Sequence, residues 1–153
     1  MNLLETEKAY LAGIFDGEGS IGIYPSKPGD NYVYHRVYFV ITNTDFTLAQ
    51  WIKDRIPIGN FKIREIRKDN DRKRPCWEWQ LCGWPRVKII LDLIQPYVVI
   101  KAKQVNLVLS LLDDERKEKG HRGEKLSPHF IERRERVAQE LKAMKIAPTQ
   151  FVH

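Results

Sequence analysis

Cysteine is scarce in this chain, and the histidines are scattered. Cys76 and Cys82 are the only cysteines among 153 residues. No histidine stands at metal-ligand spacing to another; the four are His35, His121, His129 and His153. A zinc site needs close pairs of such ligands, so this spacing argues against one and predicts two free thiols on a strand.

Long hydrophobic runs are also missing. The longest candidate, residues 87–100, is interrupted by Lys88, Asp92, Gln95 and Pro96, so a membrane span is not expected. The first ten residues, MNLLETEKAY, lack the basic start and apolar stretch of a secretory signal. We therefore expect an intracellular protein, in the cytoplasm, nucleoid or an organelle.

What the chain does have is an excess of positive charge. The formal net charge is +6 and the sequence pI is about 9.3, with 42% hydrophobic and 30% charged residues. This composition is typical of one globular domain, and the length suits one domain with a substantial core. A basic surface attracts polyanions, but only the placement of the charge can indicate nucleic acid.

Hydrophobic spacing in the first half alternates between helical and strand-like patterns. A helix is predicted from about Glu5 to Phe15, ended by the glycines of Asp16-Gly17-Glu18-Gly19. Strict alternation predicts a hairpin of two strands, 20–24 and 34–42, in which Ile21, Ile23, Val37, Phe39 and Ile41 point one way. Thr44-Asp45 can cap a helix that runs to Arg55.

The second half repeats this order and then becomes helical. A second hairpin, with Lys62 and Arg64 before a charged tip at 67–74, continues through Trp77 to Leu81. Helices are predicted at 84–94, 103–112 and, after a polar linker at 113–125, from Ser127-Pro128 to about Met144. This order predicts a single α+β domain, residues 1–153, with a four-stranded antiparallel sheet and helices on one face. Residues 5–112 would form its core, and residues 113–153 a C-terminal helical extension without a usable motif.

The other sheet face combines tyrosines with Arg and Lys and has few carboxylates. Such side chains can contact phosphates and base edges, although most antiparallel sheets also have one polar, solvated face. The candidate DNA-binding residues are Tyr24, Ser26, Tyr34, Arg36, Tyr38, Thr42, Lys62, Arg64, Glu78 and Gln80.

One motif narrows the choice of function. The stretch Leu11-Ala12-Gly13-Ile14-Phe15-Asp16-Gly17-Glu18-Gly19 resembles the signature of the LAGLIDADG homing endonucleases, with Glu18 in place of the second Asp. Residues 17–22 also match the dinucleotide pattern GxGxxG. That fingerprint requires a strand before it and a helix after it, and the order here is reversed.

A second stretch resembles the same family. Residues 95–109, QPYVVIKAKQVNLVL, are similar to the segment of single-motif members that carries a catalytic lysine, and Lys101 is the matching residue. A solvated lysine at a helix entrance is the alternative interpretation. The element order also matches the family's αββαββα-type fold, so the resemblance covers about residues 5–112.

The resemblance implies that the protein is a site-specific, double-strand DNA endonuclease, and it indicates which residues bind metal and act in catalysis. Glu18 and the Gly17 carbonyl would bind Mg²⁺ or Mn²⁺, Asn43 would position the attacking water, and Lys101 would neutralise charge on the phosphate. The family often has an arginine at the position of Thr47, so that part of the pattern is absent, and Arg36 or Lys101 remains a candidate replacement. Asp16 is expected to cap the helix junction.

A single motif copy implies that one chain builds half of an active site. Two chains would associate with two-fold symmetry. The predicted interface residues are Leu11, Ala12, Gly13, Phe15 and Asp16. The resemblance implies a long, nearly palindromic duplex target, short 3′ overhangs and an intron or intein gene, with no small-molecule substrate. A DNA-binding regulator or an RNA-splicing maturase on the same fold stays as the alternative, and the target sequence is not predicted.

Overall fold

The computed structural model describes residues 1–26, 34–64, 75–118 and 127–146, so the predicted charged tip at 67–74 lies outside the described residues. The elements follow the predicted order, including the three predicted helices after the second hairpin. They are α1 (Glu5–Glu18), β1 (Gly19–Ser26), β2 (Tyr34–Asn43), α2 (Phe46–Arg55), β3 (Asn60–Arg64), β4 (Cys76–Cys82), α3 (Trp84–Ile94), α4 (Ala102–Glu118) and α5 (Pro128–Ile146).

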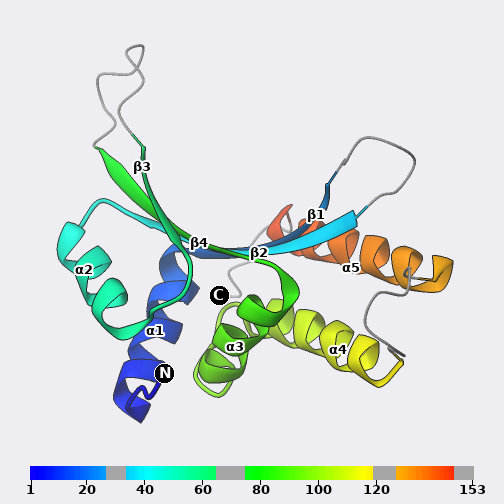
Figure 1. Cartoon of the computed structure of the whole chain (residues 1–153), viewed down its shortest axis with the longest axis horizontal. Coiled ribbons are helices and arrows are strands. Elements are labelled where there is room, and N and C mark those ends of the chain that lie inside the picture. Colours follow the sequence, from blue (N-terminus) through cyan, green and yellow to red (C-terminus); the bar gives the residue numbers. More distant parts are fainter. Residues whose placement is uncertain (27–33, 65–74, 119–126, 147–153) are drawn as a thin grey trace, which may run out of the picture.

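The four strands form one antiparallel sheet in the order β1-β2-β4-β3. The two predicted hairpins therefore join through β2 and β4, where Phe39 pairs with Leu81 and Ile41 with Trp79. Helices cover one face of the sheet, as predicted, and leave the other face open (Figure 1). Among the described residues, no helix is long and apolar enough to cross a membrane.

The core lies between the sheet and the helices. Strand side chains alternate between faces, and most apolar strand residues point toward the helices, whereas Val40 shares the open face with Gln80. Val37, Phe39 and Ile41 are fully buried, and Phe39 stacks on Phe15 of α1 with ring centroids 4.6 Å apart. This alternation confirms the predicted strand faces, and it leaves the polar partners of these residues on the open face.

Tryptophans tie the sheet to the segments that border α2. The indole N–H of Trp77 donates to the Asp45 carbonyl oxygen at 2.7 Å, and that of Trp79 donates to the Ile58 carbonyl at 3.0 Å. Asp45 is the N-cap of α2, as predicted, because its side chain accepts the Thr47 N–H at 2.8 Å. One bonded carbonyl lies directly before α2 and the other lies just after it, so both ends of α2 are attached to β4.

Helix α4 continues well beyond the predicted end near residue 112, so the expected linker at 113–125 is wrong in its first part. Its polar extension is stabilised by tertiary contacts. Glu115 is buried and accepts two hydrogen bonds from Arg134 of α5, at 2.5 and 2.7 Å. The guanidinium of Arg134 also lies over the ring of Trp84, 4.5 Å from its centroid. Helix α5 thus belongs to the same core, to which it adds Val137 and Leu141.

Candidate active site and nucleic-acid interface

The last residues of the motif lie at the junction between α1 and β1, where the helix leads directly into the strand. The sequence predicted that α1 would end near Phe15, but the helix runs through Gly17 to Glu18, and the N–H of Gly19 donates to the Phe15 carbonyl. A methyl group on Gly19 would lie 2.7 Å from that carbonyl oxygen. The approach therefore requires a glycine, and it makes Glu18 the last helical residue, directly before the sheet.

Asp16 fixes this junction to the loop that precedes α4. Its carboxylate accepts the backbone N–H groups of Val99 at 2.7 Å, Ile100 at 3.2 Å and Lys101 at 2.9 Å. Three donors converge on one carboxylate, so Asp16 closes the loop onto the end of α1. This arrangement agrees with a structural role for Asp16.

Lys101 lies at the C-terminal end of α1. Its Nζ donates to the carbonyl oxygens of Phe15, at 3.0 Å, and of Asp16. These are among the last carbonyls of the helix, where the macrodipole favours a cation. Burial lowers the pKa of Lys101, while the charges of Asp16 and Glu18 act in the opposite direction. Lys101 is therefore a half-buried cation within electrostatic range of the Glu18 carboxylate.

Glu18 differs from its neighbours because it is exposed. It makes no hydrogen bond or ion pair with any residue that the structure describes. Nor do the described residues contain a group of three or more His, Cys, Asp or Glu that could hold a metal ion. One chain thus offers a single free carboxylate at this junction, beside the exposed Gly17.

Asn43 is the last residue of β2, close to this junction. Gly19 pairs with Ile41, so the residue before Gly19 lies next to the Thr42–Asn43 end of β2. The Asn43 Oδ1 accepts the Asp45 N–H at 2.8 Å, which engages the oxygen and leaves the amide nitrogen for another partner. Thr47, where the family pattern has an arginine, is exposed in the first turn of α2.

The open sheet face carries the predicted DNA-binding residues. Tyr24, Arg36, Lys62 and Arg64 are exposed, and Tyr38, Thr42 and Gln80 are half-buried. Thr42, Glu78 and Lys62 form one row across three strands. The structure places Ser26 opposite Tyr34 at the outer end of the first hairpin, while their side chains lie outside its description.

Glu78 departs from what its sheet position suggested. Its side chain is on the open face but is only 8% exposed, and it accepts a hydrogen bond from Arg64. Gln80 similarly accepts one from the Lys62 Nζ at 3.3 Å. Alternation predicted which face these residues occupy, and the cross-strand neighbours decide how much of each remains accessible.

The predicted interface residues on α1 divide into two groups. Leu11, Ala12 and Phe15 are fully buried inside the chain's own core, so their side chains stabilise the fold and are not on the surface. Of the other two, Asp16 is half-buried and Gly13 is exposed. A side chain at Gly13, or at the exposed Gly17 one turn later, would meet open space. The exposed face of α1 that a partner could contact is therefore centred on these glycines.

No protein-family model matches the chain. Over 107 residues it is 31% identical to DNA endonuclease I-CreI of Chlamydomonas reinhardtii, an alignment that covers 68% of this chain and 61% of that relative. The chain belongs to the LAGLIDADG homing endonuclease family. The match spans less than two thirds of the relative's own length.

Solved structures of homing endonucleases share the fold. I-CvuI in complex with its target has a TM-score of 0.69 at 19% identity, covering 97% of this chain and 87% of that chain. The archaeal intron-encoded I-Vdi141I, complexed with DNA, has a TM-score of 0.71 at 16% identity, covering 96% and 87%. These matches confirm the predicted αββαββα arrangement within the homing endonuclease fold.

Three features of the chain were not predicted from the sequence. They are the buried Arg134–Glu115 pair, the buried His35, and the position of α5 against β1. A helical period at residues 128–146 signalled the helix but not where it would dock. His35 is two residues before the buried Val37 and therefore faces the core. This alternation along β2 is the one signal that could have predicted its burial.

Proposed function

We propose that two copies of this chain form a site-specific endonuclease that hydrolyses one phosphodiester in each strand of double-stranded DNA. One observation carries the proposal. Glu18 is an exposed, unpartnered carboxylate on a junction where the Asp16 and Lys101 side chains are both engaged, beside a sheet face of basic and aromatic side chains. The relative and the solved neighbours, which are named as endonucleases, support the same reaction.

The open sheet face is the surface that we assign to the DNA. Arg36, Lys62 and Arg64 can contact phosphates or guanine edges, and Gln80 can contact a base edge in the major groove. A two-fold pair of such faces would read a nearly palindromic target. Because the substrate is DNA, we place the protein in a compartment that contains DNA.

The residues at the junction fit half of a divalent-metal site. Mg²⁺ prefers oxygen ligands and binds through one or two carboxylates, and one chain supplies the Glu18 carboxylate and the Gly17 carbonyl. A second copy would supply the other half. When bound, Mg²⁺ or Mn²⁺ lowers the pKa of an attacking water and stabilises charge on the phosphate.

The chain's own residues would orient the reactants. The Asn43 amide nitrogen can hold a water beside the Glu18 end of the junction, because its oxygen is already engaged by the Asp45 N–H. The ammonium of Lys101 offsets negative charge at the phosphate. The Asp16 carboxylate accepts the backbone N–H of Lys101 and so fixes the position of Lys101 relative to α1.

Dimer formation would place the two junctions together. Gly13 and Gly17 present the open part of α1, where the absence of side chains lets two helix backbones approach closely. A free carboxylate from each chain then lies at the centre of the pair. The proposal requires this pairing, because one chain holds only one such carboxylate at the junction.

The test is to incubate the purified protein and Mg²⁺ with a randomised duplex library and to sequence the cleaved ends. We expect one enriched, nearly palindromic site cut in both strands, and no cutting by Glu18→Gln, which keeps side-chain size but removes the charge. Sequence-specific binding without cutting would favour a regulator. Activity confined to intron RNA would favour a maturase. Either result would overturn the proposal.

A further inference from the structure

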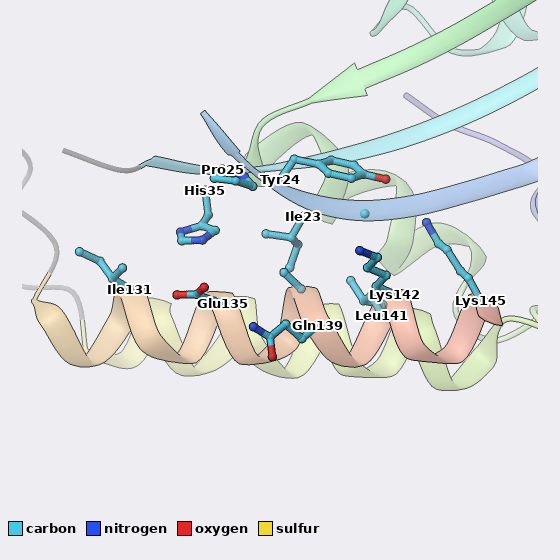
Figure 2. Close-up of a pocket in the computed structure, with 12 residues that line it drawn as sticks. Ile23, Tyr24, Pro25, His35, Ile131, Glu135, Gln139, Leu141, Lys142 and Lys145 are labelled. Atoms are coloured by element: carbon cyan, nitrogen blue, oxygen red, sulfur yellow. The ribbon is translucent and has the colours of Figure 1, made fainter. Parts of the chain in front are cut away.

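A cavity of about 640 Å³ lies between β1 and α5 (Figure 2). His35 and Glu135 line one end of it, and Lys142 and Lys145 line the other. Tyr24 of β1 also lines the cavity, and its ring lies on the side of the strand away from α5 (Figure 2). β1 is an edge strand, and no further strand separates α5 from the proposed DNA surface.

Helix α5 runs along β1 in the opposite direction and brings its C-terminal end toward the start of β1. Glu135 faces the His35 and Pro25 end, and both lysine side chains rise from α5 toward β1 (Figure 2). Lys145 is about ten residues beyond Glu135, or ~15 Å along the helix. From Pro25 back to Gly19, β1 covers roughly 20 Å. Lys145 is therefore level with the first residues of β1, which directly follow Glu18.

Electrostatics agrees with this placement. The charge of Lys145 acts on Lys101, the same ammonium that responds to Asp16 and Glu18. Burial lowers the pKa of Lys145 itself. Within residues 1–26, 34–64, 75–118 and 127–146, no carboxylate pairs with Lys145. Lys145 is exposed, and an exposed cation without a counter-ion favours an incoming anion.

A cation from α5 would add positive charge to the α1–β1 junction. Thr47 stands where the family pattern has a basic residue, and it is neutral. Lys101 is held at the end of α1 by the carbonyls of Phe15 and Asp16. Arg64, on the far edge of the sheet, is paired with Glu78. Among the described residues, neither the first turn of α2 nor the end of β2 that pairs with Gly19 holds a cation, and Arg36 lies near the other end of β2.

We propose that Lys145, brought by α5 to the start of β1 beside Lys101 and Glu18, binds a DNA phosphate next to the cleavage centre and supplies the basic group missing at Thr47. The inference rests on the proposed endonuclease function. Lys145 reaches the phosphate over the free edge of β1. Its charge positions the phosphate and adds to the field of Lys101, so it affects cleavage more than a distant phosphate contact would.

The experiment compares Lys145→Met with Lys142→Met, a matched control one turn earlier on α5 and farther from Glu18. DNA affinity is measured at several salt concentrations with Ca²⁺, and cleavage is measured under single-turnover conditions with Mg²⁺. For Lys145→Met we expect cleavage on the order of tenfold slower, and a salt slope shallower by about two, because each of the two subunits loses one phosphate contact. Lys142→Met should cleave within about twofold of the wild type, and Lys145→Arg should recover most of the rate.

Equal rates for the Lys145→Met and Lys142→Met variants, with unchanged salt slopes, would overturn the inference while leaving the endonuclease proposal intact. Binding is measured separately from cutting, so a variant that fails to cut still reports on the phosphate contact. Circular dichroism confirms that each variant is folded. A wild type that cuts no duplex would overturn the proposed function, and this inference with it.

Discussion

The α1–β1 junction and the open sheet face both carry polar side chains, but they hold them differently. At the junction, Asp16 and Lys101 bond to backbone groups, and Glu18 alone is left free. On the sheet face, side chains bond to one another, as in the Arg64–Glu78 and Lys62–Gln80 contacts. Backbone contacts do not change when a surface residue is exchanged, whereas side-chain contacts do.

This difference agrees with a division in which the junction cleaves DNA and the sheet face reads its sequence, as proposed above. The junction can keep one geometry across many DNA targets, because its partners are carbonyl and N–H groups of the chain itself. The sheet face can change its preferred sequence by exchanging residues such as Gln80 without disturbing the core beneath it. If the two regions are independent, a substitution in one should leave the properties of the other unchanged.

Lys101→Met should slow single-turnover cleavage by about a hundredfold or more, because the transition state loses one charge contact. DNA binding should fall much less. Cleavage rates at saturating protein, compared with affinity in Ca²⁺, separate these effects. A variant that loses affinity and keeps its cleavage rate would show that Lys101 is only a phosphate anchor.

Gly13→Leu should abolish dimer formation and cleavage together. The position is open within one chain, so the monomer should fold normally, but a bulky side chain would keep two α1 helices apart. Sedimentation measures the dimer and circular dichroism measures the fold, with Gly13→Ala as a milder control. A Gly13→Leu variant that stays dimeric and active would place the interface elsewhere.

Asp16→Ala should lower the free energy of unfolding by roughly 2 kcal/mol, since three backbone N–H groups lose their acceptor. Glu18 is two residues further along the chain and makes no hydrogen bond with the described residues, so Glu18→Gln should leave stability unchanged. Urea denaturation of both variants makes the comparison. Equal stabilities would mean that the Asp16 contacts do not hold the junction.

Exchanges on the sheet face should change specificity and spare the cutting rate. Gln80→Arg should change the preferred base pair at one position in each half-site, by about 1–3 kcal/mol, or about fivefold to a hundredfold in affinity. Lys62→Ala should instead weaken all targets alike. Binding to a panel of single-substitution duplexes tests this. Uniform losses for both variants would show that the face does not read sequence.

The smallest effect concerns pH and lies outside both regions. Burial lowers the pKa of His35 below its ordinary 6.5, with Glu135 opposing and Arg134 reinforcing the shift. The folded state then binds fewer protons than the unfolded state, so stability is fully present above about pH 6.5 and is lost as pH falls through the lowered pKa. His35→Leu should reduce the change in Tm between pH 7.5 and 5.5. An unchanged difference would contradict this origin.

Much of the fold could be predicted because local signals agreed with the tertiary structure. The alternation of Val37, Phe39 and Ile41 predicted the buried face, and Asp45 predicted the start of α2. The end of α4 could not be predicted, because Glu115 reads as a polar linker residue until Arg134 of α5 is placed beside it. The motif located Glu18 and Asp16, while the contacts of Lys101 and the position of Lys145 depend on how loops and helices pack.

In the proposed dimer, two Glu18 carboxylates, one from each chain, make one cutting site. The direct measurement uses a supercoiled plasmid carrying the selected target, with Mg²⁺ and three purified dimers: wild type, Glu18→Gln, and a heterodimer isolated with two affinity tags. We expect linear product from the wild type only, because each of the other dimers lacks at least one carboxylate. Linear product formed by the heterodimer or by the Glu18→Gln dimer, at a rate near that of the wild type, would contradict this arrangement.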